Sequence, residues 1–96
     1  MTKEEIKNII LKNNGILENY KVKSIALFGS YVRNEQEENS DMDFLVEFEQ
    51  DTYNNFIHLI FSLEKLFKKN ITVVSKADLS PYIMPYVLKE AEKIEG

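Results

Sequence analysis

The sequence predicts a small α/β fold in which helices pack on a short mixed β-sheet. Apolar and β-branched runs at residues 22–28, 43–48 and 71–74 are typical of strands. The segments between them space their apolar residues as helices do, and turn residues mark the junctions. The chain has 96 residues, 44% of them hydrophobic, which suffices for one modest core, so we expect a single domain over residues 1–96.

The first element expected is a helix from Thr2 to about Lys12. Thr2 is a suitable N-cap, and Glu5 three residues later has the spacing of a capping box. Apolar side chains then recur at helical intervals, at Ile6, Ile9, Ile10 and Leu17. Gly15 ends this helix or marks a break in it, and a short turn is expected to lead to Val22.

Two further helices are expected in the second half of the chain. Residues 52–68 carry one apolar stripe at steps of three and four residues, interrupted only by Glu64. Ser80 and Pro81 are typical of a helix start. The last helix is expected to turn three apolar residues inward: Ile83, Val87 and Ile94. The predicted order is therefore helix, strand, a turn with a short helix, strand, helix, strand, helix.

Composition narrows the range of functions. The chain has no cysteine, which excludes disulfides and thiolate metal sites. It has no apolar run long enough to span a membrane and no signal-peptide pattern, so we expect a cytoplasmic protein that does not bind membranes. A formal net charge of −4 argues against a surface that grips a long nucleic acid.

A Gly-Ser pair follows the first predicted strand. Glycine at position 29 allows a sharp turn and a close approach by a ligand. Ser30 is expected to cap a short helix over residues 31–34, whose free N–H groups would bind a phosphate. Arg33 could reach that phosphate or pair with a nearby glutamate. In isolation, a Gly-Ser pair is more often an ordinary turn.

Two aspartates precede or begin the second predicted strand. Residues i and i+2 of a strand face the same side, about 6.6 Å apart, so Asp41 and Asp43 can converge on one cation. Carboxylate oxygens, few in number, suit Mg²⁺ that is completed by water and nucleotide phosphates. The alternative is structural: Asp41 caps a turn, and Asp43 is a solvated strand start.

The two features together are more specific than either alone. The runs L-F-G-S-Y-V-R and S-D-M-D-F-L-V-E-F resemble those of the minimal nucleotidyltransferases, the MNT or MntA-like proteins of the DNA polymerase β superfamily. The resemblance extends over nearly the whole chain and implies a small nucleotidyltransferase fold. It implies that Gly29, Ser30 and Arg33 bind the nucleotide. It also implies that Asp41 and Asp43 are the catalytic residues and hold the metal.

The resemblance also implies a reaction and a partner. A hydroxyl would attack the α-phosphate of ATP in line, with pyrophosphate leaving and Mg²⁺ as the cofactor. In many MntA-like proteins the acceptor is a tyrosine of a HEPN-type ribonuclease toxin, which adenylylation silences. The chain would then be the antitoxin of a type VII-like toxin–antitoxin module. An acidic protein suits a more basic partner, and a homo- or hetero-oligomer is compatible with this composition.

One departure from the family pattern bears on activity. Active members usually carry a third carboxylate on the neighbouring strand, and the matching position in the run at residues 71–74 is Thr72. A threonine hydroxyl is a poor general base. Glu47 lies roughly 13 Å along the strand from Asp43, too far to replace it, and Asp78 would need a loop to fold back. The favoured hypothesis is an active adenylyltransferase; the alternative is a weak or inactive member that neutralises its partner by binding.

Overall fold

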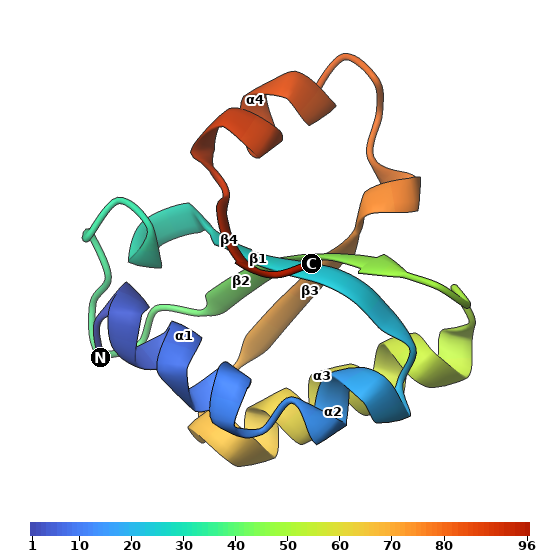
Figure 1. Cartoon of the computed structure of the whole chain (residues 1–96). Coiled ribbons are helices and arrows are strands. Elements are labelled where there is room, and N and C mark those ends of the chain that lie inside the picture. The colour runs from blue at the N-terminus through green and yellow to red at the C-terminus, as the bar shows by residue number, and fades with distance from the viewer.

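The computed structural model describes residues 1–96 and contains helices on both sides of a four-stranded sheet (Figure 1). The helices are α1 (Lys3–Lys12), α2 (Gly15–Asn19), α3 (Tyr53–Phe67) and α4 (Met84–Glu90), with short 3₁₀ helices η1 (Gly29–Tyr31) and η2 (Lys76–Asp78). The strands are β1 (Val22–Phe28), β2 (Met42–Phe48), β3 (Ile71–Ser75) and β4 (Glu92–Glu95). The predicted α/β class is confirmed.

The sheet is mixed, as predicted, with the strand order β3-β2-β1-β4. β1 pairs antiparallel with both β2 and β4, whereas β2 and β3 run parallel. β2 therefore lies inside the sheet, with hydrogen-bonded neighbours on both sides. Its first residues are fixed further by a hydrogen bond from Met42 N to the Asn70 carbonyl O at 3.1 Å, just before β3 begins.

The core lies on the face that α1, α2 and α3 cover (Figure 1). Alternate residues of a strand project to one face, and the even-numbered residues of β2 are all buried there. The helices contribute buried side chains from their apolar stripes: Ile6, Ile10, Leu17, Leu59, Leu63 and Phe67. Phe44 stacks on Phe67 with ring centroids 6.2 Å apart, which joins β2 to the end of α3.

The opposite face of the sheet, here called the open face, carries the odd-numbered residues of β2 and the β1 and β3 residues beside them. Its pairs across β1 and β2 are Phe28 with Asp43, Ala26 with Leu45 and Ser24 with Glu47. α4 lies over this face, where Leu88 borders a hollow that also includes Ala26 and Leu45. Asp43, the one predicted site residue within β2, therefore projects away from the core, whereas Asp41 precedes the strand.

The handedness of parallel connections explains why α4 lies on this face. α3 connects β2 to β3, and α4 connects β3 back across the sheet to β4, which is parallel to β3. Crossovers between parallel strands are right-handed in nearly all proteins. Two such crossovers that travel in opposite directions across a sheet place their helices on opposite faces, as Figure 1 shows for α3 and α4.

The N-terminal segment matches its prediction in part. The capping box is present: Thr2 Oγ1 accepts from Glu5 N at 3.2 Å, and Glu5 Oε1 accepts from Thr2 N at 3.1 Å. α1 ends at Lys12, as expected. Gly15 marks a break, as expected, and a turn at residues 20–21 leads to Val22. Between the two lies the short helix α2, which the sequence did not predict and which buries Leu17 against the core.

The C-terminal segment corrects the predicted last helix. α4 is only seven residues long and buries none of its side chains; Ile83 before it is 54% exposed, and Val87 within it is only partly buried. Ile94 is buried, as expected, but it belongs to the edge strand β4. Pairing with the free edge of β1 satisfies the backbone of this segment better than another helical turn, which would stay exposed.

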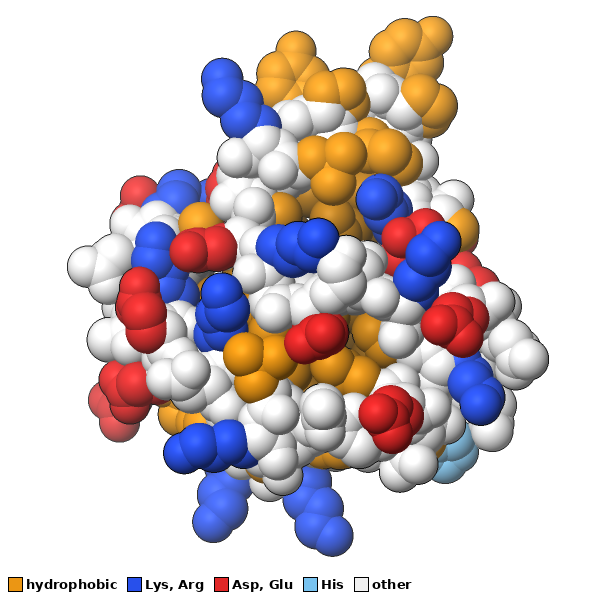
Figure 2. Space-filling model, in the orientation of Figure 1, with side chains coloured by type: hydrophobic (Ala, Val, Ile, Leu, Met, Phe, Trp, Pro, Cys, Tyr) orange, Lys and Arg blue, Asp and Glu red, His pale blue; other side chains and the backbone are white.

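Exposed apolar side chains gather on the segment around α4, at the top of Figure 2. Tyr82 and Tyr86 are 87% and 75% exposed, and Ile83 and Leu88 are also exposed. The structure therefore places both tyrosines in solvent. No helix in the structure combines the length and hydropathy that a membrane crossing requires.

Candidate active site

The chain turns sharply at Gly29, directly after β1. Gly29 has a φ of +81°, in the left-handed region that favours glycine. Its carbonyl O accepts backbone hydrogen bonds from Val32 N at 3.1 Å and Arg33 N at 3.3 Å. Tyr31 is buried in the core and fixes the position of the turn by packing there. Residues 29–33, here called the Gly29 turn, therefore hold a fixed shape at the edge of the open face.

The expected helix cap at Ser30 was wrong. The short helix is η1, Gly29–Tyr31, rather than residues 31–34, and no side chain caps it. Val32 N and Arg33 N both donate to the Gly29 carbonyl O, so neither N–H is left for the Ser30 hydroxyl to accept from. The Ser30 backbone carbonyl accepts from Glu35 N at 2.9 Å instead, which holds the chain as it leaves the turn.

Asp43 lies against the Gly29 turn. It faces Phe28 across the antiparallel β1–β2 pair, so the residue after Phe28 meets its side chain. A Cβ built on Gly29 would overlap the Asp43 carboxylate, with Oδ2 the nearest atom. Only glycine leaves room for this carboxylate, and the two halves of the predicted site are therefore in contact.

The Asp43 carboxyl is electrostatically unfavourable in its charged form. Its pKa is raised above the ordinary aspartate value, first because burial removes water from it and second because the charge of Asp41 lies nearby. The Thr72 side chain and the positive charge of Arg33 partly offset this rise. A divalent cation between the two aspartates would remove the repulsion, so the donor set fits one. The two aspartates have no third Asp, Glu, His or Cys side chain that completes a metal-binding group with them.

Thr72 occupies the position expected of a third carboxylate. It lies directly opposite Asp43 in the parallel β2–β3 register and is exposed on the open face. The strand pairing therefore confirms which β3 residue adjoins Asp43. Neither Glu47 nor Asp78 joins the two aspartates in a metal-binding group.

Arg33 belongs to an ion-pair network that the sequence predicts only in part. Its Nε contacts Glu35 Oε2 at 3.3 Å, which is one of the pairings expected. Its Nη1 pairs with Glu90 Oε1 at the end of α4, and the same oxygen accepts from Gly29 N at 3.2 Å. Sequence reasoning missed Glu90, because 61 residues separate it from Gly29 and no local pattern marks it.

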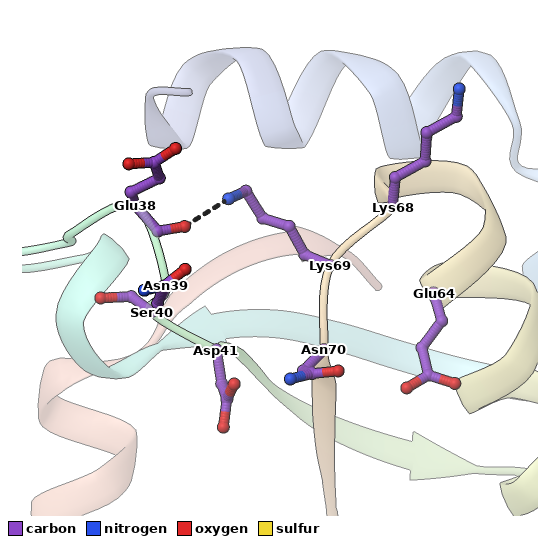
Figure 3. A pocket seen from close by; sticks show the side chains of 8 residues that line it. All are labelled: Glu38, Asn39, Ser40, Asp41, Glu64, Lys68, Lys69 and Asn70. Carbon is purple, nitrogen blue, oxygen red and sulfur yellow. Dashed lines mark hydrogen bonds between the residues drawn. The ribbon is translucent and has the colours of Figure 1, made fainter.

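A polar cleft of about 620 Å³ has Asp41 in its lining (Figure 3). None of its eight lining residues is hydrophobic: Glu38, Asn39, Ser40, Asp41, Glu64, Lys68, Lys69 and Asn70. Lys69 Nζ donates to the Glu38 carbonyl O at 3.1 Å and so ties the loop before β2 to the end of α3. The cleft shares only Asp41 with the predicted site.

Comparison with known proteins identifies the family. A family model described as a nucleotidyltransferase domain matches residues 4–94. The chain belongs to the nucleotidyltransferase family. It is 40% identical to the protein adenylyltransferase MntA of Thermococcus cleftensis over 92 residues, which cover 94% of this chain and 93% of that protein.

Solved structures place the chain among the minimal nucleotidyltransferases. One structure assigned to that group is 30% identical, with a TM-score of 0.81, and the match covers 95% of this chain and 94% of the other. A toxin–antitoxin structure with AMP-PNP is 25% identical with a TM-score of 0.77, over 94% of this chain and 73% of the other. These matches confirm the resemblance to the minimal nucleotidyltransferases that the sequence motifs indicated.

Proposed function

We propose that this minimal nucleotidyltransferase is an Mg²⁺-dependent protein adenylyltransferase that transfers AMP from ATP to a tyrosine of a HEPN-type ribonuclease toxin. Its role would be that of the antitoxin in a toxin–antitoxin module. The observation that carries the proposal is the contact between the Gly29 turn and the Asp43 carboxylate. It sets the turn that would bind the phosphates against Asp43, one of the two aspartates that would hold the metal.

Each residue has a defined task in the proposed reaction. The backbone of the Gly29 turn and the Arg33 guanidinium bind the triphosphate. Asp41 and Asp43 would hold Mg²⁺, which supplies positive charge against the phosphates. The acceptor oxygen bonds to the α-phosphorus as the bond to the β-phosphate oxygen breaks; pyrophosphate leaves with that electron pair, and the hydroxyl proton passes to solvent. Thr72 contributes no base, so transfer is expected to be slow.

Two comparisons support the choice of reaction and partner. The Thermococcus relative is a protein adenylyltransferase, and one structural neighbour is a toxin–antitoxin protein solved with AMP-PNP. AMP-PNP is an ATP analogue, which agrees with ATP as the nucleotide. The match with MntA covers nearly the full length of both chains, which supports a shared role.

A second candidate function follows from Thr72. An exposed hydroxyl stands opposite Asp43 where active members carry a carboxylate. In this alternative the protein neutralises its partner by binding, and the nucleotide is at most a ligand.

Transfer of label to the partner distinguishes the two candidates. The chain is co-expressed with its toxin and incubated with Mg²⁺ and ATP labelled at the α- or the γ-phosphate. The enzyme hypothesis expects label on a toxin tyrosine from α-labelled ATP alone, lost in Asp43→Asn and retained in Asp78→Asn, which removes a carboxylate outside the site. A toxin that co-purifies without label above the Asp43→Asn background would contradict it and support binding alone.

A further inference from the structure

Glu90 makes the only side-chain hydrogen bonds between α4 and the rest of the protein, and both go to groups assigned to nucleotide binding. Its Oε1 accepts from Gly29 N at 3.2 Å and pairs with Arg33 Nη1. A carboxylate oxygen held by a backbone N–H and a guanidinium stands where a phosphate oxygen would be held.

Glu90 and a phosphate cannot both accept from the Gly29 N–H. Gly29 has one N–H, so a phosphate oxygen that accepts from it must displace Oε1 of Glu90. A carboxylate left beside the triphosphate would also repel it, because both are negatively charged. Binding of the nucleotide at the Gly29 turn therefore requires Glu90 to leave.

The remaining contacts of α4 allow that movement. None of the seven residues of α4 is buried, and Tyr86 and Leu88 are exposed. On its C-terminal side the helix continues into β4, whose pairing with β1 does not involve the helix. α4 can therefore shift without exposing the core on the far face of the sheet.

We infer that Glu90 is an internal competitor for the nucleotide phosphates: in the ligand-free protein it occupies the phosphate position of the Gly29 turn and holds α4 over the site. ATP releases α4, and by linkage whatever draws α4 away from the turn tightens ATP binding. The inference rests on the proposed nucleotide site and adds a residue on α4 that opposes its occupation.

Calorimetry of Mg²⁺-ATP binding to the whole protein tests the inference. Glu90→Gln keeps the side-chain shape and removes the charge. It is expected to lower the Kd for ATP about three- to tenfold, the range for losing one charge-assisted competitor. Glu95→Gln is the matched control, because Glu95 is exposed on β4 and makes no ion pair, and its Kd should equal that of the wild type.

Hydrogen exchange supplies a second readout that needs no catalysis. ATP should speed amide exchange in residues 84–90 of the wild type and slow it in residues 29–33. Glu90→Gln should show fast exchange in α4 before ATP is added. Unchanged or weaker ATP binding by Glu90→Gln, with α4 exchange unaffected by ATP, would overturn the inference and leave the proposed function intact. Absence of ATP binding in wild type and variant alike would overturn both.

Discussion

Thr72 of β3 lies directly opposite Asp43 of β2, and both side chains project onto the open face. The parallel register fixes this pairing, so the residue at position 72 decides whether the aspartate pair has a third anionic neighbour. The same relationship also makes the position easy to test, because Thr72 is exposed and a change of side chain there leaves the core packing intact.

Thr72→Asp should increase both metal dependence and activity. Without metal, a third charge beside Asp41 and Asp43 should cost about 1 kcal/mol, or roughly 4–8 °C in Tm for a chain of this size. Millimolar Mg²⁺ should raise the Tm of this variant more than that of the wild type, and AMP transfer should rise about tenfold or more. Thr72→Asn is the neutral control. An equal response of all three proteins to Mg²⁺ would contradict a metal site here.

Asp43→Asn should reduce the rate of AMP transfer about 100-fold or more. The same substitution should stabilise the folded protein in the absence of metal. Because the folded state raises the pKa of Asp43, folding favours its protonated form. The charged form therefore destabilises the native state above the folded pKa, and this cost disappears below the unfolded pKa. The variant should gain in Tm at pH 7, and the gain should shrink toward zero near pH 3. Melting curves without Mg²⁺ at both pH values measure this; an equal gain at both would refute the electrostatic cause.

Gly29→Ala should destabilise the protein by about 2 kcal/mol and remove nucleotide binding. The new methyl group would overlap the Asp43 carboxylate, and the backbone φ of +81° is unfavourable for alanine. Gly15→Ala is a matched control, since Gly15 begins α2 with open space around it and should be neutral or stabilising by about 0.5–1 kcal/mol. Denaturant unfolding measures both. In Asp43→Ala the Gly29→Ala cost should fall, because only the backbone strain remains.

Ile94→Ala should destabilise by about 2–3 kcal/mol, because Ile94 is the one buried side chain of β4. Tyr86→Ala on α4 should change stability by no more than about 0.5 kcal/mol, because that ring is exposed. Unfolding of the two variants by urea compares them. Similar losses for both would show that α4 packs more tightly than its exposure indicates.

Local chemistry made much of this fold predictable. The Thr2 capping box, the stripe that becomes α3 and the three strands of β-branched residues each depend on neighbours a few residues apart. The family resemblance assigned Gly29 and Asp43 to one site, and the structure brings the two into contact.

The parts that sequence missed depend on distant contacts. β4 has the sequence E-K-I-E, with little strand propensity, and it forms because β1 offers a free edge. Glu90 reaches Gly29 only because that edge strand positions α4 over the open face. No window of a few residues carries such information.

The two faces of the sheet differ in how freely the residues that cover them can be substituted. The core depends on α1, α2, α3 and the sheet, whereas α4 contributes no buried residue. Substitutions confined to residues 79–91 could therefore alter the exposed aromatic surface and the Glu90 contact together, at little expense in folding. Related chains are expected to diverge fastest in this segment, so that the exposed aromatic surface and the Glu90 contact change in step.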